Sequence, residues 1–179
     1  MHLILKIARM GNPVLQIRAK EISKPRSHEV SQIITFMKDT LEDSKGVGLA
    51  APQVHVSQRI VIIHINEEVA KEYKCEIVPL TVLINPEITI LTEERESDWE
   101  GCLSIPGMLG KVPRFTRIRY RALTPKGKMI EKEATGFHAR VIQHECDHLD
   151  GVLYPMRMDD LTLLGFEEEI RNRIKKDGL

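Results

Sequence analysis

The chain has 179 residues, a length that fits one domain with a buried core and is short for two. Its 26 Lys and Arg balance its 26 Asp and Glu, so we expect no specific DNA partner and no anionic membrane partner. No apolar run reaches the roughly 20 residues that cross a bilayer, and three cysteines are too few for a disulfide framework. These numbers predict a single globular domain, residues 1–179, in a reducing cytosol.

The first half of the chain predicts one helix and several strands. Apolar residues recur at helical spacing from Ser27 to about Asp43, behind a serine suited to the N-cap. Residues 59–65 and 81–84 are rich in β-branched residues and predict strands, and we expect Pro86 to end the second. A short third strand is predicted at residues 88–91.

The second half predicts a hairpin followed by two helices. Arginines alternate with apolar residues in 114–123, as in a strand with one solvated face, and a turn at 126–127 leads into a second strand at 129–135. Helices are predicted at 136–150 and at 160–176, the latter acidic toward its start and basic toward its end. Strands followed by a central helix favour an α+β fold over alternating βαβ units.

The strongest chemical signal is the segment His144-Glu145-Cys146-Asp147-His148. In a helix, His144 and His148 lie about 40° apart on one face, where their imidazoles can hold one cation. Glu145 lies one step round the helix, near such a cation but poorly placed to bind it, which suits a general base. Phe137 and Val141 share the histidine face, and two unpaired buried imidazoles would be costly. The pattern therefore predicts a metal site.

A catalytic metal site of this kind usually needs a third protein ligand. Cys146 lies about 160° round the helix from His148 and is expected to be a core residue. Glu167 and Glu168 have the rough spacing of the third ligand in one class of zinc endopeptidase, although they also suit the solvated start of the last helix. Cys102 remains, in a Gly- and Pro-rich stretch where we expect irregular backbone, and that context favours it.

Two further segments are weaker signals. Small residues in 46–53 allow a ligand close to the backbone, and Gln53 offers an amide donor, but such segments are more often packed turns. The alternating arginines also allow a non-enzymatic alternative. In it, a structural metal ion only stabilises the domain, and this row of arginines binds RNA. The four arginines of the row are Arg114, Arg117, Arg119 and Arg121.

Taken together, three segments resemble the motifs of the peptide deformylase family. They are Gly-x-Gly-Leu-Ala-Ala-x-Gln at 46–53, Glu-Gly-Cys-Leu-Ser at 100–104 and Gln-His-Glu-x-Asp-His at 143–148. The resemblance implies antiparallel strands wrapped around a central metal-binding helix, with an amino-terminal and a carboxy-terminal helix. It also implies a metal-dependent amide hydrolase that removes the formyl group from the initiator formylmethionine of new polypeptides and releases formate. A zinc endopeptidase with Glu167 as third ligand is the alternative.

The resemblance also assigns roles to single residues. The metal ligands would be Cys102, His144 and His148, with Glu145 as catalytic carboxylate. Gln53 and the Leu103 N–H would stabilise the oxyanion. The substrate would bind along Gly46 and Gly48, and its methionine side chain would lie among Val47, Phe137 and Val141.

The remaining expectations concern the metal, the partners and the compartment. We expect one divalent metal ion per chain, with Fe²⁺ favoured in the cell and Zn²⁺, Ni²⁺ or Co²⁺ able to replace it. The expected partner is an N-formylmethionyl peptide or nascent chain, with a weak ribosome contact. The expected location is the bacterial cytoplasm, or an organelle if a transit peptide has been removed.

Overall fold

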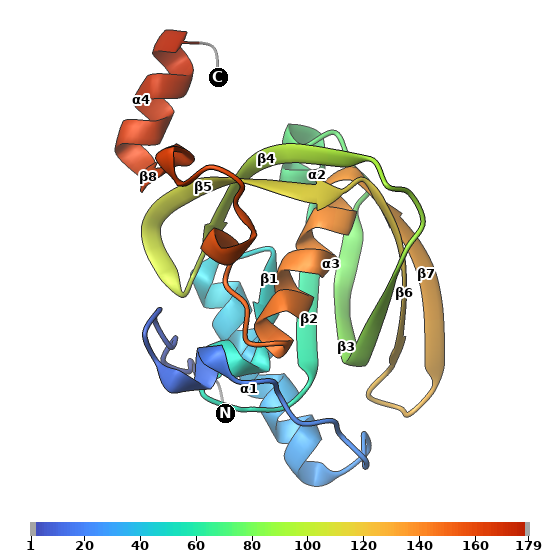
Figure 1. The fold of residues 1–179 in the computed structure, drawn as a ribbon. Helices are drawn as coiled ribbons and strands as arrows, with labels where there is room; N and C mark the ends of the chain where they lie inside the picture. The colour runs from blue at the N-terminus through green and yellow to red at the C-terminus, as the bar shows by residue number, and fades with distance from the viewer. Residues whose placement is uncertain (1–2, 178–179) are drawn as a thin grey trace.

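The computed structural model describes residues 3–177, which form two antiparallel sheets around a helix (Figure 1). Within that range one sheet has the order β1-β2-β3-β6-β7 and the other the order β4-β5-β8. The strands are β1 (Gly48–Ala50), β2 (Ile60–Ile65), β3 (Val78–Ile90), β4 (Arg95–Cys102), β5 (Ile105–Phe115), β6 (Arg117–Leu123), β7 (Met129–Thr135) and β8 (Leu164–Phe166). The α-helices are α1 (His28–Ser44), α2 (Glu67–Glu72), α3 (Gly136–Leu149) and α4 (Glu167–Asp177). Short 3-10 helices are η1 (Pro13–Gln16), η2 (Ala51–Val54), η3 (Tyr154–Arg157) and η4 (Leu161–Leu163).

The α3 helix lies at the centre and contacts strands of both sheets (Figure 1). Strand β2 explains how the core forms around it, because successive side chains of a strand point to opposite faces. Val61 and Ile63 pack toward α3, whereas Ile60 and Ile62 pack toward α1 on the other face. A third buried cluster joins η1, β5 and η3. The apolar run of β2 is therefore buried on both sides.

Several elements confirm the sequence predictions. The α1 helix begins after Ser27, whose hydroxyl oxygen accepts a hydrogen bond from the Val30 N–H. The α3 helix spans Gly136–Leu149, and the β6–β7 hairpin turns where predicted. The antiparallel α+β fold with a helix near each end is therefore confirmed. None of the helices in the described residues is long and apolar enough to cross a membrane.

Two predicted strand limits are wrong. Pro86 does not end a strand, because β3 continues through it to Ile90 after a register shift between Ile84 and Glu87. Asn85 adopts a left-handed backbone with φ 50°, which lets the strand bend and pair again. The predicted strand at 114–123 is two strands, since β5 ends at Phe115 and β6 begins at Arg117.

The predicted start of the last helix is wrong. Residues 161–166 are not α-helical, because they form η4 and β8, and α4 begins only at Glu167.

The irregular backbone predicted around Cys102 is present. Cys102 is the last residue of β4 and follows a break in the strand register between Glu100 and Cys102. A tight turn at Leu103 and Ser104 then leads into β5, with Cys102 paired to Ile105.

Candidate metal centre and active site

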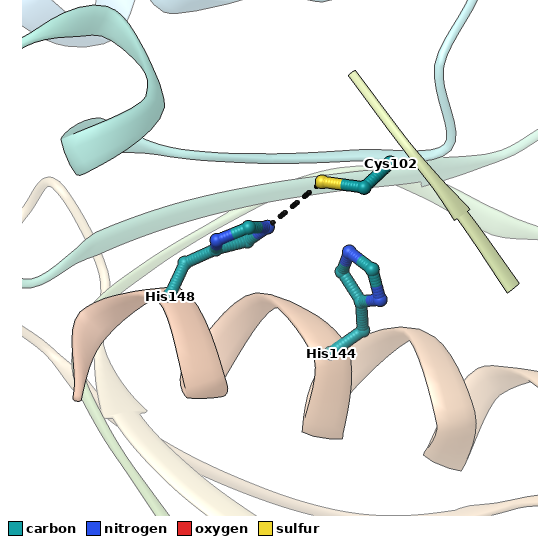
Figure 2. A group of neighbouring side chains, drawn as sticks. All are labelled: Cys102, His144 and His148. Carbon is teal, nitrogen blue, oxygen red and sulfur yellow. Dashed lines mark hydrogen bonds between the residues drawn. The ribbon is translucent and has the colours of Figure 1, made fainter. Parts of the chain in front are cut away.

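Three side chains converge on one point between α3 and the end of β4. His144 and His148 project from successive turns of α3 toward Cys102 (Figure 2). The Cys102 sulfur lies 3.3 Å from His148 Nε2, and the three candidate ligand atoms all lie within 4.8 Å of one another. The structure therefore brings together the three residues that the sequence analysis named as metal ligands.

This group fits a divalent transition metal. One thiolate and two imidazoles are a donor set that such metals prefer, with a fourth position open. Ordinary zinc–sulfur and zinc–nitrogen lengths in a tetrahedral centre place sulfur and nitrogen about 3.6 Å apart. The observed 3.3 Å between the Cys102 sulfur and His148 Nε2 is close to that separation. The same residues can hold iron, nickel or cobalt.

Glu100 orients one of the imidazoles. Its Oε2 lies 2.8 Å from His144 Nδ1, which leaves His144 Nε2 for the group around Cys102. Arg114 donates to both Glu100 oxygens, at 2.9 and 3.0 Å. Burial alone raises the pKa of Glu100, but the hydrogen bonds from His144 and Arg114 outweigh it and hold this pKa well below its usual range. Glu100 is therefore an anion despite its burial.

Two further arginines complete the buried charge network. Arg140 NH1 donates to Glu100 Oε1 at 2.8 Å and to the Val112 carbonyl at 2.7 Å, and its NH2 donates to the Glu96 carbonyl at 2.6 Å. Asp147 accepts hydrogen bonds from Arg114 and Arg157. Sequence reasoning placed Arg114 in the row of alternating arginines and gave Glu100 no role beyond its motif. Both are instead buried partners of the metal-site residues, and only the position of Glu100 next to Cys102 in its motif pointed to such a role.

Donors also surround the Cys102 sulfur. The Ser104 N–H lies 3.4 Å from the sulfur and Gln53 Nε2 lies 3.5 Å from it. Gln53 is almost fully buried, and its Oε1 accepts a hydrogen bond from the Ala50 N–H at 2.8 Å. That bond fixes the amide so that its N–H₂ points toward the centre. Leu103 follows Cys102 directly in the turn.

Glu145 lies beside the centre without belonging to it. Its side chain is buried, and its Oε2 has no hydrogen-bond partner among the described residues. Burial raises the pKa of Glu145 to about 7. Such a carboxylate can accept a proton near neutral pH. Gly48 touches it so closely that an added Cβ would lie 2.7 Å from the Glu145 Cδ.

A cavity of about 700 Å³ opens next to the centre. Cys102, His144, Glu145 and Gln53 all line it, so the cavity reaches the group of candidate ligands. The predicted substrate-binding residues also line it, and these are Gly46, Val47, Gly48, Phe137 and Val141. Sequence reasoning missed Tyr73 and Trp99, which line the same cavity.

The structure does not bring the alternative ligand to this centre. Glu167 lies on α4 and pairs with Arg171 at 2.7 Å, outside the group of three ligands. The endopeptidase reading with Glu167 as third ligand is therefore not supported, because Cys102 fills that place.

The arginine row is not a free cationic surface. Arg114 is buried and pairs with Glu100. On β6, Arg117 and Arg119 pair with Glu133, at 2.6 and 2.9 Å. Arg121 likewise pairs with Glu87 on β3 at 2.7 Å. With these charges neutralised, the row gives little support to the RNA-binding alternative.

The family comparison agrees with this geometry. Residues 4–163 match the family model described as polypeptide deformylase. The chain belongs to the polypeptide deformylase family. It is 48% identical over 168 residues to peptide deformylase 1 of Nitrosomonas europaea, covering 94% of this chain and 95% of that one.

Solved deformylase structures share the fold. A Met-Ala-Ser-bound peptide deformylase from Acinetobacter baumannii superposes with a TM-score of 0.81 at 34% identity, covering 88% of this chain and 100% of that one. A peptide deformylase from Thermotoga maritima has a TM-score of 0.79 at 36% identity, covering 89% and 100%. As a family member, the protein is a metal-dependent hydrolase that removes the N-formyl group from nascent peptides.

Proposed function

We propose that deformylation takes place in the 700 Å³ cavity, with Cys102, His144 and His148 as metal ligands. The observation that carries this proposal is the arrangement of Glu145 and the Gln53 amide around the three converging ligand atoms. A proton acceptor and an oxyanion donor then flank one open position, which is what hydrolysis of an amide requires.

The cation expected here is Fe²⁺ in the cell, while Zn²⁺, Ni²⁺ or Co²⁺ can take its place. When bound, it supplies a Lewis acid that acidifies water and polarises a carbonyl oxygen. The His144 ring is held for this purpose by Glu100, as partners of ligating histidines commonly do. The Ser104 N–H and the Gln53 amide both lie within hydrogen-bonding distance of the Cys102 sulfur.

The chain's own groups carry the proton transfers. Glu145 removes a proton from the attacking water as the formyl carbon becomes tetrahedral. Gln53 Nε2 and the Leu103 N–H donate to the oxygen on which charge develops, and each well-placed donor contributes about 3 kcal/mol to the transition state. Glu145 then returns the proton to the leaving amine, and formate and a free methionyl terminus are released.

The peptide binds as an extended strand along Gly46, Val47 and Gly48, which makes recognition largely independent of its later side chains. The methionine side chain lies among Val47, Phe137 and Val141. The contact of Gly48 with Glu145 leaves little room at the attacked carbon, which favours formyl over acetyl. The Met-Ala-Ser-bound relative supports this class of ligand.

The setting for this reaction is the bacterial cytoplasm, where nascent chains are made, and the bacterial origin of the similar proteins supports it. A weak contact with the ribosome would bring the cavity near its substrate. Cosedimentation of the protein with ribosomes at low and high salt tests that contact.

The deciding experiment compares formyl-Met-Ala-Ser with acetyl-Met-Ala-Ser under anaerobic conditions. We expect rapid release of formate and at least a hundredfold slower release of acetate, because the acetyl methyl group has little room beside Gly48 and Glu145. Comparable rates would contradict the proposal. Cys102→Ala should lose both metal and activity, and retention of the metal in that variant would show that the thiol is not a ligand.

A further inference from the structure

Tyr73, at the C-terminal end of α2, lines the cavity against Phe137, which lies about two turns of α3 before His144. Its ring stacks on Phe137, with centroids 3.9 Å apart and an interplanar angle of 15°. Both rings line the cavity, and Val69 of α2 lines it beside them. Tyr73 is nevertheless 42% exposed, so its outer face borders solvent. The ring is therefore a wall between the cavity and the outside.

The distance from the candidate metal ligands to this wall is close to the length of the substrate's methionine side chain. Phe137 lies seven positions before His144 on α3, a rise of about 10 Å along the helix axis. Val141 lies between them and also lines the cavity. At ordinary bond lengths, the methyl group of an extended methionine lies about 7 Å from its formyl carbon. If the formyl carbon lies at the metal ligands and the methionine side chain runs along α3, its methyl group thus lies near the Phe137–Tyr73 pair.

The segment that carries Tyr73 is anchored to the rest of the molecule. A helix of six residues is not stable alone, so α2 depends on tertiary contacts. Glu76, three residues after Tyr73, places its Oε1 2.6 Å from the buried His138 Nδ1. His138 Nε2 in turn lies 3.4 Å from the Tyr120 hydroxyl. Ala70 of α2 packs into the core below.

Two further elements border the cavity beside Tyr73. Trp99 of β4 and Arg171 of α4 both line the cavity with the Tyr73 ring. Removing the ring would open the cavity into the space among these three elements.

We propose that Tyr73 is a specificity-determining residue whose ring, stacked on Phe137, sets the length of the first side chain that the enzyme accepts. The inference rests on the proposed function, because it takes the cavity as the binding site of the formylated residue. The aromatic wall suits a thioether, whose sulfur packs favourably against rings.

The test uses three variants of the metal-loaded enzyme. Tyr73→Ala removes the wall, and Tyr73→Phe keeps the ring without the hydroxyl. Ile77→Ala is the matched control, since Ile77 lies in the same segment, is 58% exposed and does not line the cavity. Each variant is assayed with formyl-Met-Ala-Ser and with the formyl-ethionine analogue, whose side chain is one carbon longer.

For Tyr73→Ala we expect KM for formyl-Met-Ala-Ser to rise about tenfold, the loss expected when one aromatic wall of a thioether pocket is removed. The value of kcat should stay within about twofold. The preference for methionine over ethionine should disappear or reverse. Ile77→Ala should behave like the wild type, and Tyr73→Phe, which keeps the ring, should keep the preference for methionine over ethionine. General damage to the site cannot improve the longer substrate relative to the shorter one.

Binding provides a second readout that does not depend on turnover. Trp99 is the single tryptophan of the chain and lines the same cavity, so its fluorescence can report binding of the product Met-Ala-Ser and of its ethionine analogue. Tyr73→Ala should weaken the first far more than the second. An unchanged methionine-to-ethionine ratio in both KM and Kd would overturn the inference. Absence of formate release by the wild type would instead overturn the proposed function.

Discussion

At the scale of single residues, Gly48 is constrained by the catalytic carboxylate rather than by its own backbone. A Cβ at this position would lie 2.7 Å from Glu145 Cδ and still closer to Oε1, with Glu145 held in the core by α3. We predict that Gly48→Ala lowers kcat at least a hundredfold, because displacing a general base by about 1 Å is enough for such a loss. The fold should persist, and circular dichroism can confirm it.

Gly165→Ala is the matched control for that variant. Its added Cβ would meet only the Ile170 side chain, with Cδ1 at 3.2 Å and Cγ1 at 3.3 Å, and a shift of a few tenths of an ångström in that side chain relieves both contacts. Normal activity in Gly165→Ala and loss in Gly48→Ala would assign the effect to Glu145. Full activity in Gly48→Ala would mean that the carboxylate does not need its observed position.

The second prediction separates proton transfer from metal binding. Glu145→Gln is nearly isosteric, and Glu145 is not one of the three converging ligand residues. It should therefore keep one metal per chain and the wild-type fold, while kcat falls by several orders of magnitude. Metal analysis and steady-state kinetics check both parts. Loss of the metal from this variant would make the carboxylate a ligand.

At the scale of elements, Arg140 joins the two parts of the chain that bring the ligands together. It lies on α3 one turn before His144, and it donates to β4 at Glu96 and Glu100 and to β5 at Val112. The β4–β5 hairpin carries Cys102, so the guanidinium fixes the distance between thiol and imidazoles. The cavity thus depends on a buried charge that the motifs do not include.

We predict that Arg140→Met destabilises the protein by about 3 kcal/mol, because it leaves buried acceptors without their donor. Metal affinity should also fall, by roughly tenfold to a hundredfold, as for other residues that support metal ligands. Urea unfolding and competition with a chelator measure the two effects. Arg121→Met, which breaks an exposed pair with Glu87, should change stability by less than about 1 kcal/mol. Equal effects of the two substitutions would contradict the assignment.

Sequence patterns predicted the elements with strong periodicity and missed those defined by distant pairing. The α1 and α3 helices have buried stripes and clear ends, and β2 is an apolar run. Strand β4, with the sequence RESDWEGC, is mostly polar, and β5 contains two prolines and two glycines. Each forms a strand because the other pairs with it from Arg95–Phe115 to Cys102–Ile105, and local propensity does not contain that information.

The candidate site shows the same division. The spacing of His144 and His148 in a helix was enough to predict that they share a face, and Cys102 followed from its motif. The hydrogen bond between Glu100 and His144 could not be predicted in this way, because it depends on which side chain of the β4–β5 hairpin lies beside α3 in the folded protein. Tyr73 was missed because α2 is a short helix with weak periodicity, and its position over the cavity depends on the anchor between Glu76 and His138.

At the scale of the whole molecule, the described fold does not depend on the metal group for its core. Three clusters of buried apolar residues hold the sheets and helices together, and Cys102 only borders the third. Arg114 also pairs with both Glu100 and Asp147, which links β5 to β4 and α3 through protein groups alone. This differs from a small zinc domain, in which metal binding supplies the folding free energy.

We therefore predict that chelation removes activity while the fold remains. The metal-free protein should keep the circular dichroism of the loaded form and unfold in one cooperative step. Its melting temperature should be several degrees lower, because the loaded form gains the free energy of a ligand that binds only the native state. Anaerobic addition of Fe²⁺, Ni²⁺ or Co²⁺ should restore formate release without a refolding step. A metal-free protein that loses its circular dichroism at room temperature would show that the cation, rather than the three apolar clusters, holds α3 against the β4–β5 hairpin.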